Sequence, residues 1–232
     1  MPTIEEARHW YFGDTDLAGD PVHGFDHVLR VYRMAEKLAL SEGADIEIVR
    51  AAALLHDANR GGPASIHPQY PGEGKGERRL AHQVDAAEIA HQVLEAEGWS
   101  EERIEAVQHC IRSHRFRESA ETPRTLEAKI LFDADKLDAI GAIGVARAIS
   151  FAACAGQPAY TEPSALFLRT GNLEENERHS AYHEYHFKLV RLKDRLYTTA
   201  ARSLAEERHR WMVEFFERLA LEAEEECDAL QD

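Results

Sequence analysis

The chain has 232 residues, of which 44% are hydrophobic and 30% charged, so it is long enough to bury a core and too apolar to be disordered. Its formal net charge of -15 argues against a sequence-independent grip on nucleic acid polymers or anionic membranes, because the field of the whole molecule repels polyanions. A small anionic ligand held by a metal ion and a few local cations remains compatible with this charge.

The cysteines and the apolar segments indicate the cellular compartment in which the protein is expected. Cys110, Cys154 and Cys227 are far apart and form no CxxC pair, which argues against a disulfide framework or a thiolate zinc site. The amino-terminal segment is acidic and lacks the apolar stretch of a secretory signal, and the sequence has no run of about 18 apolar residues. We therefore expect a cytoplasmic protein without a membrane span.

The spacing of apolar residues predicts an all-α protein, and no segment is typical of a β-strand. A short helix and a turn are predicted within residues 1–26. An amphipathic helix over Phe25–Ser41 follows, with Gly43 as its stop. His27 continues the apolar stripe at the start of this helix, so it is either a core histidine or a ligand that faces the interior.

The stretch Asp45–Arg60 follows, and the helix predicted in it is apolar over almost its whole surface, which is typical of a helix in the middle of a fold. Asp45 is its expected N-cap. The helix ends at His56 and Asp57. A buried carboxylate is costly without a partner, so either this end of the helix reaches the surface or the two residues have a strong partner.

An irregular segment is predicted over residues 61–79, where Lys75 and neighbouring arginines either meet an anionic substrate or form a solvated basic loop. A helix over Leu80–Glu97 follows. His82 lies at its start, beside the loop, and is the histidine of this helix that we favour as a site residue.

A further helix is predicted over Ser100–Phe116, where His114 extends the apolar stripe and His109 points nearly opposite. The segment Thr125–Ala148 is predicted to be one helix or a helix pair. Asp135 and Asp138 interrupt one apolar face of it, whereas Asp133 lies well around the helix; the alternative role for Asp135 is a hydrogen bond to a neighbouring helix.

The carboxyl-terminal part contains a second irregular segment over residues 155–178 and one or two helices over His179–Leu230. His179 and His183 have the i, i+4 spacing of zinc ligands on a helix. Ser180 stands where the HExxH motif has glutamate, so the sequence does not favour an independent metal site here.

Residues of metal-ligand type interrupt or end buried faces of three predicted helices. They are His27, His56, Asp57 and Asp135. Imidazole and carboxylate ligands suit Mn, Fe, Ni, Mg or Zn, and the lack of thiolate argues against a structural zinc site. Such a site leaves coordination positions open for water and for a phosphate oxygen.

The order H…HD…D on helices resembles the HD-domain superfamily of metal-dependent phosphohydrolases. HGFDHVLRVYRMA resembles its first ligand helix, LLHDANR its HD doublet, and ILFDADKLDAIGAIGVAR the aspartate helix of an uncharacterised bacterial subgroup. The carboxyl-terminal helices are also similar, so the resemblance covers roughly residues 20–222. It implies an all-α helical bundle around a central metal cleft, as a single HD domain over 1–232 with its core at about 20–150 and a helical extension over 179–230.

The resemblance also implies roles for particular residues. Metal ligands for one or two divalent ions would be His27, His56, Asp57 and Asp135. Asp57 would in addition orient the nucleophilic water or bridge a second metal. Contacts to a second metal or to phosphate would come from His82 and His114. Apart from the resemblance, we expect substrate contacts from His23, Arg60, Lys75 and Asp138.

We therefore expect hydrolysis of a phosphate ester or phosphoanhydride in a small phosphorylated substrate, a nucleotide, by metal-activated water. One alternative is a metal- or nucleotide-binding regulatory protein without turnover. Another is a structural helical module whose buried polar residues satisfy one another. For the acidic carboxyl-terminal helix, packing in a homodimer and exposure to solvent are both open.

Overall fold

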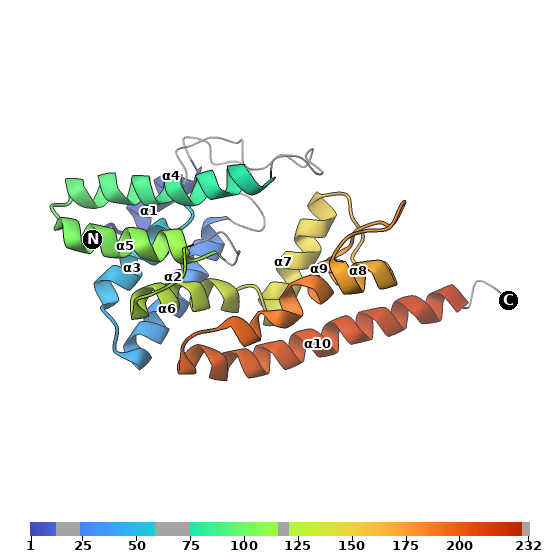
Figure 1. The fold of residues 1–232 in the computed structure, drawn as a ribbon. Helices are drawn as coiled ribbons and strands as arrows, with labels where there is room; N and C mark the ends of the chain where they lie inside the picture. The colour runs from blue at the N-terminus through green and yellow to red at the C-terminus, as the bar shows by residue number, and fades with distance from the viewer. Residues whose placement is uncertain (13–23, 59–74, 116–120, 229–232) are drawn as a thin grey trace. The chain divides into compact units, whose positions relative to one another are not determined.

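The computed structural model describes residues 1–12, 24–58, 75–115 and 121–228, and for residues 9, 12, 75–83 and 225–228 it describes the backbone alone. Within these ranges the regular elements are all helical, as Figure 1 shows, which confirms the all-α prediction. The described chain divides into two compact units. The first contains Met1–Asp135 and Leu196–Ala201, and the second contains Lys136–Arg195 and Arg202–Asp232. The predicted single domain with an extension over 179–230 stays a prediction.

The first unit is built from six helices of the described chain. They are α1 (Ile4–Phe12), α2 (Phe25–Glu42), α3 (Ile46–Leu55), α4 (Lys75–Ala96), α5 (Glu101–Ser113) and α6 (Leu126–Leu137), the last of which crosses into the second unit. α4 and α5 lie side by side (Figure 1), and α3 contacts α1, α2, α4 and α5. α3 is therefore the helix around which this unit packs.

α3 owes its central position to its composition. Val49 and every residue from Ala51 to Leu55 are fully buried, which confirms the predicted central helix. Asp45 caps the helix as predicted, because its Oδ1 accepts hydrogen bonds from the backbone N–H groups of Glu47 and Ile48 at 3.0 and 3.2 Å. The helix ends at Leu55 with His56 as its C-cap, in agreement with the predicted end at His56 and Asp57. Burying each leucine of this helix contributes about 1.5–3 kcal/mol.

The start of α4 corrects the sequence-based prediction. The helix begins at Lys75, within the segment over 61–79 that the sequence indicates as irregular. The glycines of this segment favour an irregular structure. The lysine, glutamate and arginines after Gly74 are good helix formers, however, and the helix includes Gly76 in its first turn. The rest of that segment, residues 61–74, lies outside the described residues.

The predicted helix pair over Thr125–Ala148 is confirmed as α6 and α7 (Gly141–Cys154). Gly141 begins α7 with φ +73°, a conformation that side chains with a Cβ rarely adopt. A Cβ at Gly141 would also lie 3.0 Å from Cβ of Arg208, so α7 and α10 pack closely at this position. In the described chain no single helix is long and apolar enough to cross a membrane; α6 and α7 reach that length and apolarity only when counted together.

The second unit also contains α8 (Ala165–Thr170), α9 (Ala181–Phe187) and two 3₁₀ turns, η2 (Leu189–Arg191) and η3 (Lys193–Arg195). α8 lies in the segment over 155–178 that the sequence indicates as irregular, where Ser164 caps it by accepting from the N–H of Phe167. The long helix α10 (Thr199–Asp228) begins in the first unit and continues in the second.

Asp133 attaches the start of α10 to α6 within the first unit. Its carboxylate is fully buried and accepts hydrogen bonds from the N–H groups of Tyr197 and Thr198 at 2.8 and 2.7 Å, and from the Thr198 hydroxyl at 2.8 Å. Glu42 adds a further bond, because its Oε1 accepts from the N–H of Ala200 at 2.8 Å. Asp133, which the sequence places away from the helix face that carries Asp135, therefore anchors residues 197 and 198, which are distant in the sequence.

We expect Asp133→Ala to lower the free energy of unfolding by about 3 kcal/mol, because it leaves the two buried donors of Thr198 and the part-buried N–H of Tyr197 without an acceptor. Urea unfolding followed by circular dichroism measures the change. Asp194→Ala removes an exposed carboxylate and should stay within about 0.5 kcal/mol of the wild type. Equal stability of Asp133→Ala and Asp194→Ala would contradict this anchoring role.

Candidate metal centre

The polar residues of the first unit gather where helices begin or end. His27 lies in the first turn of α2, His56 is the C-cap of α3 and Asp57 follows it. His114 is the C-cap of α5, and Asp135 lies in the last turn of α6. A helix end can bring a side chain to the edge of the core while the apolar body of the helix stays packed, so this placement assembles polar groups without breaking a helix.

Three of the predicted ligands meet in space. His27, His56 and Asp135 each offer one ligand atom, and these atoms all lie within 4.8 Å of one another. His27 Nε2 is 3.5 Å from Asp135 Oδ1. The two histidines are buried, and the Asp135 side chain is 18% exposed. Two imidazole nitrogens and a carboxylate oxygen at this separation can hold one divalent metal ion.

Asp57 has different neighbours at its two oxygens. Oδ2 lies 3.5 Å from His56 Nε2 and 4.0 Å from His27 Nε2. Oδ1 lies 3.6 Å from His114 Nε2 and 3.1 Å from Arg115 Nη2. One oxygen therefore faces the histidines of the candidate metal centre, and the other faces a third histidine and an arginine.

The histidine rings are held by the ends of their own helices. His56 Nδ1 is 2.8 Å from the Ala53 carbonyl oxygen, and His114 Nδ1 is 2.6 Å from that of Ile111. A carbonyl can only accept, so Nδ1 carries the proton in each ring, and a neutral ring presents a lone pair at Nε2. This is the tautomer that a metal ligand needs, with the orienting hydrogen bond that accompanies it.

His56 Nε2 supports a metal at this position. It is fully buried and has no hydrogen-bond partner among the described residues. A buried nitrogen without a partner is costly, and coordination of a cation would remove that cost. The ring also contacts those of His27 and His114 edge-on, with centroids 5.5 and 5.2 Å apart, so its orientation is fixed by packing.

The charges in the site have the states that a cation requires. Burial alone would raise the pKa of Asp57, but the neighbouring His56, His114 and Arg115 hold that pKa well below its usual range. Burial lowers the pKa of His114 despite the attraction of Asp57. Near neutral pH the carboxylate is thus ionised and the His114 ring neutral, which are the ligand forms that bind a divalent cation.

The structure leaves several predicted substrate contacts outside the described residues. These are His23 and Arg60, together with the side chains of Lys75 and His82. Asp138 is described and forms an ion pair with Arg147 at 2.9 Å, with 6% of its side chain exposed. A substrate role for Asp138 would require this pair to open, and it stays a prediction.

Arg115 is not among the site residues predicted from the sequence, and the predicted orientation of His109, away from the apolar stripe, is wrong. Arg115 follows His114 directly in the segment IRSHRFR, and adjacency to a histidine on an inward face is the signal that could have identified it. His109 is buried, not turned away from the core: its Nδ1 lies 2.8 Å from Glu121 Oε1 and its Nε2 accepts from the N–H of Arg124 at 3.1 Å. A loop after the helix supplies these partners, and helical periodicity cannot indicate it.

A second histidine cluster, in the other unit, has a structural explanation. His183 is fully buried between Ser180, whose Oγ is 2.8 Å from Nδ1, and Glu177, whose Oε1 is 3.0 Å from Nε2. His179 Nδ1 is 3.3 Å from Gln157 Oε1. Both nitrogens of His183 are occupied by side chains, in agreement with the sequence, which does not favour a metal site at this pair.

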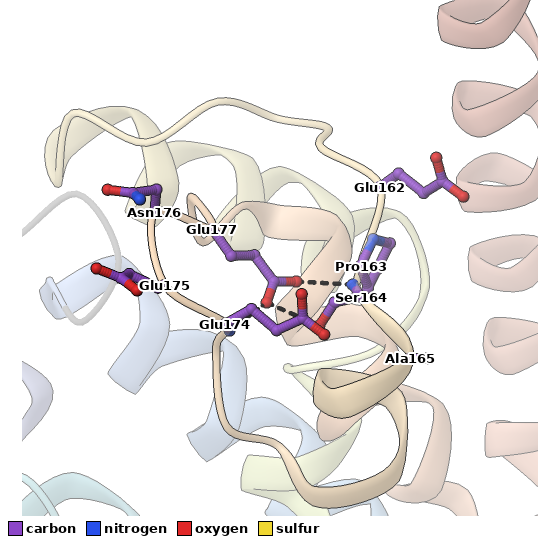
Figure 2. A pocket seen from close by; sticks show the side chains of 8 residues that line it. All are labelled: Glu162, Pro163, Ser164, Ala165, Glu174, Glu175, Asn176 and Glu177. Atoms are coloured by element: carbon purple, nitrogen blue, oxygen red, sulfur yellow. Dashed lines mark hydrogen bonds between the residues drawn. The ribbon is translucent and has the colours of Figure 1, made fainter.

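Figure 2 shows the open hollow beside this cluster, with the Glu177 carboxylate turned toward Ser164. Glu177 Oε1 accepts from the Ser164 N–H at 2.7 Å, and Oε2 accepts from the Ser164 hydroxyl and the Glu174 N–H at 2.8 and 2.7 Å. These bonds, the Ser164 N–H first, lower the pKa of Glu177 from 4.5 to about 2 despite partial desolvation. The carboxylate therefore organises its own loop.

Comparisons with known proteins identify the family to which the chain is similar. A model of the HD domain matches residues 24–140. The uncharacterised protein YpgQ of Bacillus subtilis is 34% identical to this chain over 224 residues, which cover 94% of this chain and 93% of YpgQ. The matched region contains every predicted metal ligand.

Solved structures extend the similarity to the fold. The crystal structure of B. subtilis YpgQ in complex with ADP superposes with a TM-score of 0.65 and 29% identity, covering 95% of this chain and 97% of YpgQ. An HD-superfamily hydrolase from Bacillus thuringiensis superposes with a TM-score of 0.64 and 27% identity, covering 95% of this chain and 94% of that chain. In both cases the similarity spans nearly the whole chain.

His56→Ala should weaken the binding of Mn²⁺ at least about 10- to 100-fold, the range found even for residues that only support metal ligands. Isothermal titration with MnCl₂ and elemental analysis of protein purified without chelator measure the loss. His91→Ala, at a half-buried histidine of α4, is the matched control and should bind as the wild type does. Unchanged Mn²⁺ affinity in His56→Ala would argue against the metal centre.

Glu177→Gln should destabilise the protein in a pH-dependent way. The pKa of Glu177 is lowered to about 2 by folding, so its contribution is fully present above pH 4.5 and is lost as the pH falls toward 2. The difference in urea midpoint between wild type and variant should be constant from pH 7 to about 5 and narrow below about 4.5. Glu175→Gln, an exposed neighbour, should show no such trend; a trend of equal size in both variants would refute the prediction.

Proposed function

The chain belongs to the HD-domain family, and on that premise we propose that it is a metal-dependent phosphohydrolase that cleaves a phosphate ester or phosphoanhydride bond of a nucleotide. The observation that carries this proposal is the cluster of the buried His27 and His56 with the partly exposed Asp135. Within this cluster, His56 Nε2 is buried and has no hydrogen-bond partner among the described residues. The ADP in the YpgQ structure supports a nucleotide as the ligand class.

The ion would be held by His27, His56 and Asp135, with Oδ2 of Asp57 as the fourth protein ligand. Oδ2 is placed for this, because it faces the Nε2 atoms of both histidines. When bound, a divalent ion supplies a Lewis acid for the phosphate and lowers the pKa of a coordinated water. Mn, Fe, Ni, Mg and Zn all accept such a mixed nitrogen and oxygen ligand set, and one or two ions are proposed.

Asp57 would orient the attacking water. Its lowered pKa keeps the carboxylate ionised, so it accepts a hydrogen bond strongly but holds a proton poorly. Orientation is thus the role that its charge state supports, and the proton from the water would pass to another group or to solvent.

His114 is the described group best placed for a second role. Its neutral ring presents Nε2 to Asp57 Oδ1 at 3.6 Å. Two atoms with lone pairs at this separation are stabilised by a proton or a second cation between them. We therefore retain His114 as a contact to a second metal or to phosphate. His82, His23, Arg60 and Lys75 keep their proposed roles from the sequence.

A nucleotide-binding regulator without turnover is the second candidate function. The observation that favours it is that the YpgQ complex contains ADP, which establishes binding and not hydrolysis for that protein. Both candidates predict nucleotide binding in the presence of metal, and only the hydrolase predicts product. The cytoplasmic location, the absence of a nucleic acid polymer as partner and the homodimer stay predictions.

Mn²⁺-loaded protein should release phosphate or pyrophosphate from at least one member of a nucleoside mono-, di- and triphosphate panel. Asp57→Asn should lower kcat about 10²- to 10⁴-fold, because it loses the charge that orients the water. Product release is measured by anion-exchange chromatography. Asp85→Asn, at an exposed aspartate of α4, is the control. Tight nucleotide binding without product would favour the regulator, and full activity of a His56→Ala, Asp57→Ala double variant would refute both roles of the doublet.

A further inference from the structure

Arg115 supplies a positive charge at the candidate metal centre that no predicted site residue accounts for. Its Nη2 donates to Asp57 Oδ1 at 3.1 Å, and its side chain is 23% exposed. It directly follows His114, whose ring is fixed against the end of α5. Arg115 therefore follows a residue whose ring is held in place at the candidate metal centre, and its side chain still reaches solvent.

The contact with Asp57 leaves most of the guanidinium available. An arginine has five N–H donors in a planar fork, and Asp57 is the one hydrogen-bond partner of Arg115 that the described residues provide. The oxygen that it contacts is Oδ1, whereas Oδ2 faces His27 and His56. Asp57 can thus serve a metal ion with one oxygen and Arg115 with the other, with no competition between the two cations for the same atom.

The charge balance of the site with one divalent ion favours such a cation when an anion binds. Asp57 and Asp135 bring two negative charges to the centre, and one divalent ion neutralises only these. A nucleotide phosphate adds further negative charge in a protein whose formal net charge is -15. A partly buried guanidinium beside the metal position offsets that charge, and its fork matches two phosphate oxygens.

We propose that Arg115 binds a phosphate group of the ligand through the N–H groups that Asp57 does not use, and so acts as a substrate-binding residue. This inference rests on the proposed function, since it takes the ligand to be a phosphorylated compound held beside the metal ion. Asp57 orients the guanidinium, and Arg115 links the metal ligand Asp57 to the substrate.

The test compares phosphate binding in three variants of the full-length, Mn²⁺-loaded protein. Arg115→Met removes both the charge and the donors. Arg115→Gln removes the charge and the fork but keeps an N–H donor for Asp57. Arg112→Met is the matched control. Arg112 lies in the last turn of α5, three residues before Arg115, and it pairs with Glu105 and Glu121 and with no residue of the candidate metal centre among the described residues. Calorimetric titrations with inorganic phosphate, with ADP and with MnCl₂ are made on each, with elemental analysis of bound Mn.

Arg115→Met and Arg115→Gln should both bind phosphate and ADP about 10- to 100-fold more weakly than the wild type, as expected for the loss of a charged hydrogen bond. Their Mn content should equal that of the wild type, and Arg112→Met should bind both probes unchanged. If Arg115 only stabilised Asp57, Arg115→Gln would restore phosphate and ADP affinity to within about twofold of the wild type, and that result would overturn the proposal. If Arg115→Met does not fold, Arg115→Gln decides by the same criterion.

The two proposals fail in different ways. Wild-type protein that binds phosphate through Arg115 but turns over no nucleotide would refute the hydrolase and leave the role of Arg115 intact. Wild-type protein that hydrolyses a nucleotide while both Arg115 variants retain wild-type affinity would refute the role of Arg115 alone. Absence of phosphate and ADP binding in the wild type would overturn the inference about Arg115.

Discussion

The constraint on which the site depends is the charge of Asp57, a carboxylate with 11% of its side chain exposed. Burial opposes that charge, and the neighbouring His56, His114 and Arg115 hold the pKa of the carboxyl group low. These groups come from the ends of α3 and α5, and His27 joins them from α2. Because α3 packs against both α2 and α5, the apolar packing of one helix and the electrostatic stabilisation of one carboxylate are satisfied by the same arrangement.

The helix ends perform two tasks with a single contact. His56 and His114 are both C-cap residues, and each binds the carbonyl oxygen three residues earlier through Nδ1. The bond satisfies a carbonyl that the end of a helix leaves without a partner. It also fixes the tautomer and turns Nε2 toward Asp57. The orientation of the two rings, whose centroids lie 5.2 Å apart, is thus coupled to where α3 and α5 end.

The sequence could predict what depends on local pattern. The buried central helix, the Asp45 cap and the helices that carry His27, His56 and Asp135 all follow from apolar spacing and cap chemistry. Roles set by distant partners could not be predicted. Asp133 and Asp135 are two residues apart. Asp133 nevertheless accepts hydrogen bonds from the backbone N–H groups of residues 197 and 198, about sixty positions later. Periodicity identifies the face of a helix, but it does not identify the group that will lie opposite.

The division of Asp57 between its two oxygens has a consequence for how ligands bind. A cation held through Oδ2 weakens the attraction between the carboxylate and Arg115, because the negative charge is then shared between two positive groups. On the proposed roles, the guanidinium would then be more available to a phosphate, and metal and anion would favour each other. Such coupling is reciprocal in binding free energy: whatever factor the ion adds to phosphate affinity, phosphate adds to the affinity for the ion. An acidic protein can in this way keep a site that repels free anions until the metal is in place.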